Sequence, residues 1–244
     1  MAHKEQLDFF NNLGEIIVSN KKLSEINILE IGSYDVNGSV RNIFKESNYL
    51  GIDLIDGPGV DLVMNGEDIR KLNKKFDIII SSECFEHAVN WKKIFLAMID
   101  CVKDNGYIIM TCASTGRIEH GTKRSDFFFK MESSPGTKDN YYKNLNKKDF
   151  FQNFDISKIF ERYFFFYNIH SFDLYFVGQK KTDSNSNDID KLEKKVISDN
   201  SFKPSIKSIK RFLLHSILPQ KFCNDLHFKN LERKLKRNKN VEKI

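Results

Sequence analysis

Short apolar runs alternate with amphipathic segments over the first half of the chain. Five runs predict strands, which we expect at residues 27–31, 48–53, 60–64, 76–82 and 106–112. The clearest run is apolar and β-branched from Phe76 to Ser82, as expected of a parallel strand that is buried on both faces. Helical spacing of apolar residues predicts helices at 5–20, 39–46 and 91–102. Alternating strands and helices indicate right-handed crossovers and a parallel sheet.

This rhythm changes after residue 113. A stretch that contains Gly, Ser and Lys runs to about residue 145, and a helix is expected at 147–154. Two aromatic segments, 162–168 and 171–179, are close enough in sequence to form a hairpin, so one of them is expected to run antiparallel. We therefore predict an α/β fold with a doubly wound, seven-stranded, mostly parallel sheet and an antiparallel edge strand.

The chain divides into a predicted domain at 1–180, a polar linker at 181–202 and a basic helical tail at 203–244, with helices at 206–217 and 226–235. The tail holds twelve Lys or Arg and three acidic residues, a net +9, so the remainder carries −3 of the total charge of +6. Three interpretations of the tail stay open: a solvated helix pair, an element that docks on a membrane surface or a partner protein, and a nucleic-acid-binding element. Nucleic acid is the least favoured partner.

The lack of targeting signals in the sequence and the scattered cysteines predict a cytoplasmic protein. No apolar run approaches the roughly 20 residues that cross a bilayer, and the N-terminus lacks the features of a signal peptide. The cysteines form no Cys-x-x-Cys pair and are expected to be free thiols; they are Cys84, Cys101, Cys112 and Cys223. The alternative is a peripheral location, in which the basic tail binds the inner face of the membrane.

Residues at the strand ends predict a cofactor site. Gly32 and Gly38 frame a turn after the first strand, and Asp53 ends the second strand, where a carboxylate can accept both hydroxyls of a ribose. The turn lacks the spacing G-x-G-x-x-G and carries Glu30 and Asp35. These carboxylates would repel a pyrophosphate but favour a sulfonium and an α-amino group, which predicts S-adenosylmethionine rather than a dinucleotide. A purely structural turn and a capping role for Asp53 are the alternatives.

Four segments carry a resemblance to a known family: 28–32, 50–54, 76–87 and 102–109. They resemble motifs of the class I, Rossmann-like, S-adenosylmethionine-dependent methyltransferases, and the resemblance covers residues 26–180. It implies that Glu30, Gly32 and Gly38 face the methionine part and that Asp53 holds the ribose. Asn65 stands where the family usually has an Asp for the adenine, with Glu67 or Asp68 as alternatives. The full set of cofactor residues that we expect is Glu30, Gly32, Ser33, Tyr34, Gly38, Asp53, Leu54, Asn65, Gly66, Glu67, Ser82 and Glu83.

Methyl transfer to a hydroxyl requires alignment and the loss of a proton from the acceptor. Histidine, with an ordinary pKa of about 6.5, is the natural base near neutral pH. We expect His87, beside Glu86, to be the base or the residue that orients the acceptor, and His120 is its rival. Capping a helix or packing under a loop is an equal alternative for His87. Neither histidine has metal-ligand spacing in the sequence, so no metal is predicted.

The acceptor is predicted from a second resemblance. Segments 111–122 and 133–145 are similar to a bacterial group of methyltransferases associated with surface-polysaccharide and other glycan assembly. The resemblance implies O-methylation of a sugar, with Tyr141 and Tyr142 contacting the sugar and Arg117 and Arg124 facing phosphate or carboxylate groups. A lid with solvated charges is the alternative for this region.

Two other functions stay open. An RNA methyltransferase is disfavoured because residues 1–202 are not basic and lack an Asn/Asp-Pro-Pro-aromatic motif after the fourth strand. A non-catalytic partner protein that binds S-adenosylmethionine is the other alternative, if both histidines are structural.

Overall fold

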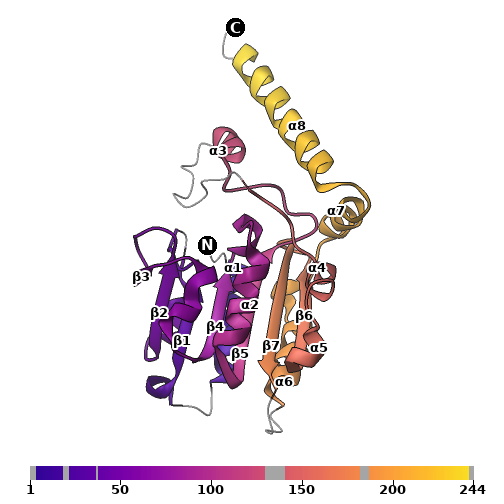
Figure 1. Cartoon of the computed structure of the whole chain (residues 1–244). Coiled ribbons are helices and arrows are strands. Elements are labelled where there is room, and N and C mark those ends of the chain that lie inside the picture. Colours follow the sequence, from indigo (N-terminus) through magenta and orange to yellow (C-terminus); the bar gives the residue numbers. More distant parts are fainter. Residues whose placement is uncertain (1–3, 19–21, 37, 130–140, 182–186, 242–244) are drawn as a thin grey trace.

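A single seven-stranded sheet organises the molecule (Figure 1). The computed structural model describes residues 4–18, 22–36, 38–129, 141–181 and 187–241. The predicted site segment at 133–137 therefore lies outside the described residues, as does the linker at 182–186. In spatial order the strands are β3 (Leu62–Val63), β2 (Asn48–Asp53), β1 (Asn27–Ile31), β4 (Phe76–Ser82), β5 (Val102–Ala113), β7 (Asp173–Lys180) and β6 (Phe160–Asn168). The predicted Rossmann-like sheet is confirmed.

The antiparallel part of the sheet is confined to one strand. β7 pairs antiparallel with both β5 and β6, whereas β1 pairs parallel with β2 and β4, and β4 pairs parallel with β5. β6 therefore forms the outer edge, and the reversed strand β7 lies between it and β5. This agrees with the predicted hairpin, although the sequence did not indicate which of the two strands is reversed.

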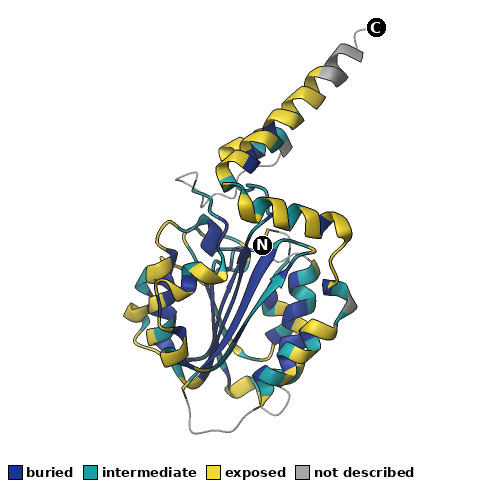
Figure 2. Ribbon diagram, turned by 90° about the vertical axis from the view of Figure 1, so that its right-hand side faces the viewer, coloured by how far each residue is buried: buried dark blue, intermediate teal, exposed yellow. Residues whose placement is uncertain are grey.

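Helices cover both faces of the sheet, and Figure 2 shows the buried strands between them. One face packs against α1 (Lys4–Ile17), α6 (Asp188–Ser198) and the 3-10 helix η2 (Val40–Phe44). The other packs against α2 (Trp91–Cys101), α4 (Lys147–Phe151), α5 (Ile156–Ile159) and the 3-10 helix η3 (Gly66–Leu72). Shorter 3-10 helices are η1 (Leu23–Glu25), η4 (Phe85–His87) and η5 (Asn200–Phe202). The result is a three-layer sandwich with a core on each side of the sheet.

The predicted linker at 181–202 contains a structured element. Helix α6 contacts α1 and buries Ile189, Leu192 and Val196 in the same core as the strands. These residues recur at helical spacing within a polar sequence, so one face of the helix is apolar although the segment as a whole is hydrophilic. Residues 188–198 are therefore part of the folded domain rather than a connection to the tail.

Three helices lie beyond the carboxyl ends of the strands. They are α3 (Lys123–Phe129), α7 (Ile206–Ile217) and α8 (Gln220–Val241), and α8 extends away from the sheet (Figure 1). Arg124 of α3 joins α8 through Asp225, 2.7 Å from Nη1 to Oδ1, and its guanidinium lies 4.3 Å from the centre of the Phe228 ring. Within the described ranges no helix is long and apolar enough to cross a membrane.

Candidate functional site

A cavity opens at the carboxyl ends of β1, β2 and β4. This is the place where the strand order of an open parallel sheet reverses and ligands usually bind. Segments that follow β3 and β5 complete the wall. Its lining residues are Ile31, Gly32, Tyr34, Val36, Ile52, Asp53, Leu54, Ile55, Met64, Asn65, Gly66, Glu83, Cys84, His87, Ala88, Ile94, His120 and Gly121.

Asp53 holds its carboxyl group at one end of the cavity. Its Oδ2 accepts a hydrogen bond from the backbone N–H of Tyr34 at 3.2 Å, and its Oδ1 accepts one from Leu54 N at 2.7 Å. Asn65 also lines the cavity, and its Oδ1 accepts from Glu67 N at 3.1 Å at the start of η3. The carboxyl of Asp53 is thus positioned by backbone groups, whereas the carbonyl of Asn65 already caps a helix.

The turn after β1 brings backbone close to the wall formed by Cys84. Gly32 has φ of +80°, and a Cβ at this position would lie 2.8 Å from Cys84 Cβ. Gly66 is similarly confined, because a Cβ there would lie 2.8 Å from Ile31 Cγ2. Only glycine fits at Gly32 without strain. Larger residues at these two positions would therefore displace the neighbouring side chains that line the cavity.

Seven of the twelve cofactor residues expected from the sequence line the cavity: Gly32, Tyr34, Asp53, Leu54, Asn65, Gly66 and Glu83. The other five lie outside its lining: Glu30, Ser33, Gly38, Glu67 and Ser82. The apolar lining residues and Cys84 were not identified from the sequence. Their only signal was their position next to the motif residues. Burial raises the pKa of the Cys84 thiol to about 12, so this sulfur stays protonated at neutral pH.

Glu30 was expected to face the methionine part of the cofactor, but it does not line the cavity. It lies on the opposite face of β1 from Ile31, and its Oε2 accepts a hydrogen bond of 2.7 Å from Tyr49 Oη. Burial raises the pKa of its carboxyl group to about 7. Alternate residues of a strand point to opposite faces, so the carboxylate that reaches the cavity from this part of the sheet is Glu83.

Three of the other expected cofactor residues, Gly38, Ser82 and Glu67, contact residues of the protein outside the cavity lining. Gly38 N donates to Asp35 Oδ1 at 2.7 Å, and Thr111 Oγ1 donates to Ser82 Oγ at 3.2 Å. Glu67 forms an ion pair of 3.5 Å with Lys93. Buried Ser33 Oγ has no hydrogen-bond partner among the described residues.

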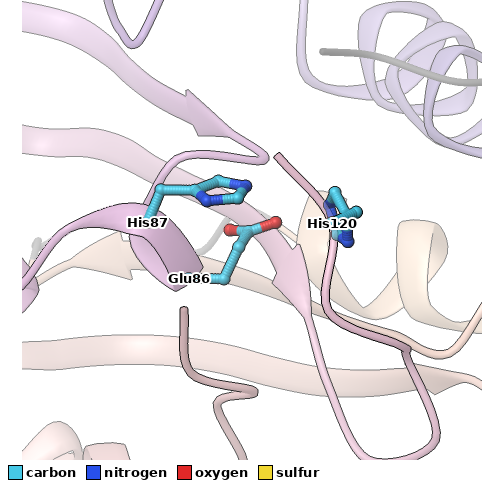
Figure 3. Close-up of side chains that lie close together, drawn as sticks. All are labelled: Glu86, His87 and His120. Atoms are coloured by element: carbon cyan, nitrogen blue, oxygen red, sulfur yellow. The ribbon is translucent and has the colours of Figure 1, made fainter. Parts of the chain in front are cut away.

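Glu86, His87 and His120 lie close together, and the two histidines line the cavity (Figure 3). Glu86 and His87 belong to η4, directly after β4, and His120 belongs to the loop after β5. One ligand atom of each side chain lies within 4.8 Å of the others. The rings of His87 and His120 are 5.3 Å apart and nearly perpendicular, and the Tyr142 ring lies 5.4 and 5.0 Å from them. The structure thus unites both histidines that the sequence left as rivals.

Burial controls the charge of this cluster. Glu86 is fully buried, and burial together with the charge of Glu83 raises its pKa well above the ordinary value. Burial lowers the pKa of His87 to about 4. The pKa of His120 is also lowered to about 4, by burial and then by the charge of Arg117. Both imidazoles are therefore neutral at pH 7.

Glu83, which lines the cavity, has a strained backbone. Its φ is +50°, an uncommon conformation for a residue other than glycine, and such residues cluster at functional sites. Gln6 Nε2 donates to its Oε1, while its Oε2 lies 3.8 Å from Arg117 Nη2 and 3.9 Å from His120 Nε2. The carboxylate is therefore held where its charge acts on both the cavity and the histidine cluster.

The expected substrate residues divide into two groups. Tyr142 reaches the cluster and donates from its hydroxyl to Ile118 O at 3.2 Å, and Tyr141 beside it is half-buried as well. Arg117 instead pairs with Asp173 at 3.4 Å, and Arg124 pairs with Asp225 on α8. Both guanidinium groups thus have carboxylate partners within the protein, so the expectation that they face a substrate anion has no support from these contacts.

Residues 3–163 match the sequence model of a family described as a methyltransferase domain. The chain belongs to this family. The predicted methyltransferase class and its cofactor, S-adenosylmethionine, are thereby confirmed at the level of the family. No curated protein sequence matches the chain.

Solved structures of other methyltransferases resemble this methyltransferase domain at low identity. The CurJ carbon methyltransferase is 15% identical with a TM-score of 0.48 over 70% of this chain and 54% of that one. An O-methyltransferase family protein from Burkholderia thailandensis is 11% identical with a TM-score of 0.43 over 75% and 62%. The N-methyltransferase NodS from Bradyrhizobium japonicum WM9, in complex with S-adenosyl-L-homocysteine, is 9% identical with a TM-score of 0.49 over 74% and 89%. The chain thus spans 54% and 62% of the length of the first two, and the three names specify no common acceptor atom.

Proposed function

We propose that this methyltransferase domain transfers a methyl group from S-adenosylmethionine to a hydroxyl oxygen of a sugar or glycan. The observation that carries the proposal is that Asp53 and the His87–His120 pair line one and the same cavity. A donor nucleoside and an acceptor hydroxyl would therefore meet in the same space, which is the main requirement of a direct transfer.

The cavity fits the cofactor in shape and charge. Gly32 and Gly66 line the cavity with backbone alone, and Asp53 offers two carboxylate oxygens to the ribose hydroxyls. Asp53 and Glu83 are the acidic residues of the lining, which has no Lys or Arg among the described residues. A negative lining favours a ligand with a positive sulfur and an amino group. When bound, S-adenosylmethionine supplies an activated methyl carbon on that sulfur.

The transfer step indicates which roles His87 and His120 can take in the wall of the cavity. The acceptor oxygen forms its bond to the methyl carbon while the carbon–sulfur bond breaks, sulfur keeps the electron pair, and the hydroxyl proton passes to water. With a pKa of about 4, His87 and His120 are weak bases at neutral pH. We therefore assign them the orientation of the acceptor rather than its deprotonation.

A sugar fits this wall better than RNA does. Two imidazoles line the cavity with the Tyr142 ring packed against them, and polar tips on aromatic rings suit a molecule with both apolar and hydroxyl faces. An RNA backbone would need cations near the reacting group, and the lining described above is acidic. The resemblance of segments 111–122 and 133–145 to methyltransferases of glycan assembly points the same way.

Acceptor screening tests the proposal. The full chain is incubated with methyl-labelled S-adenosylmethionine and, separately, with sugar nucleotides, oligosaccharides and RNA. We expect label in carbohydrate and much less in a reaction with Asp53→Asn. Label in RNA alone would overturn the glycan proposal, and tight cofactor binding without transfer to any acceptor would favour the non-catalytic alternative.

We further propose that α7 docks on an anionic membrane surface. Its outward face is apolar, with exposed fractions from 39% to 82% at Ile206, Ile209, Leu213, Leu214 and Ile217. Lys207 and Lys210 are exposed beside this stripe, and α7 contains no acidic residue. An apolar stripe with flanking cations matches the interfacial helices that bind negatively charged lipid. Such docking would suit an acceptor carried on a lipid.

Vesicle sedimentation tests the docking. We expect the chain to sediment with vesicles of phosphatidylcholine and phosphatidylglycerol, and the double variant Ile206→Ser/Ile217→Ser to stay in the supernatant. The matched control is Ile197→Ser, which replaces an exposed isoleucine of α6. Equal sedimentation of both variants, or loss of a dimer rather than of lipid binding in the double variant, would contradict the proposal.

A further inference from the structure

The imidazoles of His87 and His120 and the carboxyl group of Glu86 lie together beside the cavity. They come from segments that lie apart in the sequence, because Glu86 and His87 follow β4 and His120 follows β5. Their ligand atoms lie within 4.8 Å of one another. Imidazole and carboxylate groups in this combination are a donor set for divalent transition-metal ions. The prediction that no metal binds was based on spacing in the sequence and could not account for this convergence.

Two polar atoms of the cluster are buried without a hydrogen bond. Glu86 Oε2 and His87 Nδ1 have no such partner among the described residues. Figure 3 shows the carboxyl group of Glu86 below the ring of His87, with the ring of His120 on its other side. Buried polar groups are nearly always hydrogen-bonded, so two unsatisfied atoms directed into one small space indicate that a ligand satisfies both.

The other atoms of the cluster are held as metal ligands usually are. His120 Nδ1 lies 3.1 Å from Ile118 O, and a carbonyl only accepts, so Nδ1 carries the proton and Nε2 keeps a lone pair. Glu86 Oε1 accepts from Ala113 N at 3.1 Å, which leaves Oε2 for a ligand. Metal-binding histidines typically donate their second N–H to a carbonyl or carboxylate in this way.

Charge around the cluster also favours a cation. Three carboxylate side chains are buried here: Glu83, Glu86 and Asp173. The partly buried guanidinium of Arg117 approaches Asp173 and Glu83. Carboxyl groups beside imidazoles supply the oxygen donors that divalent cations accept. Glu83 Oε2, at 3.9 Å from His120 Nε2, is within reach as a fourth ligand.

We propose that Glu86, His87 and His120 bind one divalent cation beside the methyl-transfer site. Ligand atoms about 2.1 Å from one ion lie ~3 to 4 Å apart, so side-chain movements of about 1 Å close the set. As an extension that rests on the proposed function, the cation binds the acceptor hydroxyl and makes its proton easier to release to water. A vicinal diol of a sugar would bind such an ion through both oxygens.

Titration of the chelator-treated full chain with Mn²⁺ by calorimetry tests the site. We expect about one Mn²⁺ per chain for the wild type and for the control His170→Ala, whose histidine is half-exposed and pairs with Glu5. Removal of a neighbouring group that supports a ligand typically weakens a metal site about 10- to 100-fold, so His120→Ala and Glu86→Gln should each weaken Mn²⁺ binding by at least as much. Circular dichroism and binding of S-adenosyl-L-homocysteine report whether the variants fold.

Pulsed electron paramagnetic resonance on the wild-type chain gives a test without variants, and we expect coupling of bound Mn²⁺ to imidazole nitrogen. Absence of this coupling, or equal Mn²⁺ affinity of wild type, His120→Ala and Glu86→Gln, would overturn the site. Failure of the wild type to bind Mn²⁺, Co²⁺ or Zn²⁺ would do the same. The titration contains neither cofactor nor acceptor, so a negative result leaves the proposed methyl transfer standing. A loaded chain that methylates no carbohydrate would remove the proposed function but keep the site.

Discussion

Asp53 lines the cavity at the end of β2, where we expect its carboxyl group to bind the ribose of the cofactor. Two backbone N–H groups fix its orientation, so both oxygens present their remaining lone pairs to the cavity without a cost in side-chain order. The sequence could place this residue beside the cavity because its position depends only on where β2 ends.

Asp53→Asn should weaken binding of S-adenosyl-L-homocysteine roughly tenfold to a hundredfold, because a hydrogen bond to a charged group contributes about 1.5 to 3 kcal/mol. Isothermal titration calorimetry measures the change. Asp56→Asn is the matched control, since Asp56 is an exposed acid of the same loop that does not line the cavity. Equal losses in both variants would assign the effect to net charge rather than to contact with the ribose.

Glu30 predicts a pH dependence of stability. Its pKa in the folded chain is raised from 4.5 to about 7 by burial, so the ionised form is disfavoured in the folded state. Stability is therefore lost as pH rises from the unfolded pKa through 7, by roughly 3 kcal/mol when the loss is complete. Glu30→Gln removes this titration. Urea unfolding of both chains at pH 5 and pH 8 should show the wild type losing more stability than the variant, and parallel losses would contradict the assignment.

The histidine cluster marks the limit of prediction from residues alone. His87 and His120 were both identified as candidates, yet as alternatives to each other. Their meeting depends on the path of the loop after β5, in which Gly121 has φ of +62° and a Cβ there would lie 2.9 Å from His87 Cε1. No periodicity encodes such a path, so the shared site was not visible in the sequence.

Strands were easier to predict than helices at the scale of elements. β1, β2 and β4 begin and end at the predicted residues because each is a compact apolar run between polar ones. Helix α6 was missed because its apolar stripe is short and its neighbours are Ser, Asn and Asp. The spacing of Ile189, Leu192 and Val196 was the available signal.

Leu192→Ala tests whether α6 belongs to the domain. The side chain is fully buried, so its truncation should reduce the free energy of unfolding by about 2 to 5 kcal/mol. Lys194→Ala, on the exposed side of the same helix, should change it by less than about 0.5 kcal/mol. Urea denaturation gives both values. Similar stabilities for the two variants would return residues 188–198 to the role of a linker.

At the scale of the whole molecule, Arg124 of α3 is one of the residues that hold the first turns of α8. Arg124 combines its ion pair to Asp225 with a position over the Phe228 ring, and Phe128 packs on the same ring at 5.2 Å. The pair is partly exposed, so its contribution is modest: roughly 1 kcal/mol for the ion pair and the cation–π contact together.

Arg124→Glu should accordingly speed amide hydrogen exchange in the first turns of α8 about fivefold, which corresponds to roughly 1 kcal/mol. The double variant Arg124→Glu/Asp225→Arg restores opposite charges and should recover part of the protection. Exchange followed by mass spectrometry measures both. If the single variant exchanges as slowly as the wild type, α8 is held by other contacts.

The position of β7 between β5 and β6 has a consequence for the newly synthesised chain. β5 supports the loop that carries His120, yet one of its edges is paired only by residues 173–180. Until the ribosome has released that stretch, β5 exposes an unpaired backbone edge, and such edges invite association between nascent chains. Translational arrest before β7 should therefore yield a species that depends on chaperones, although every cavity-lining residue has already been made.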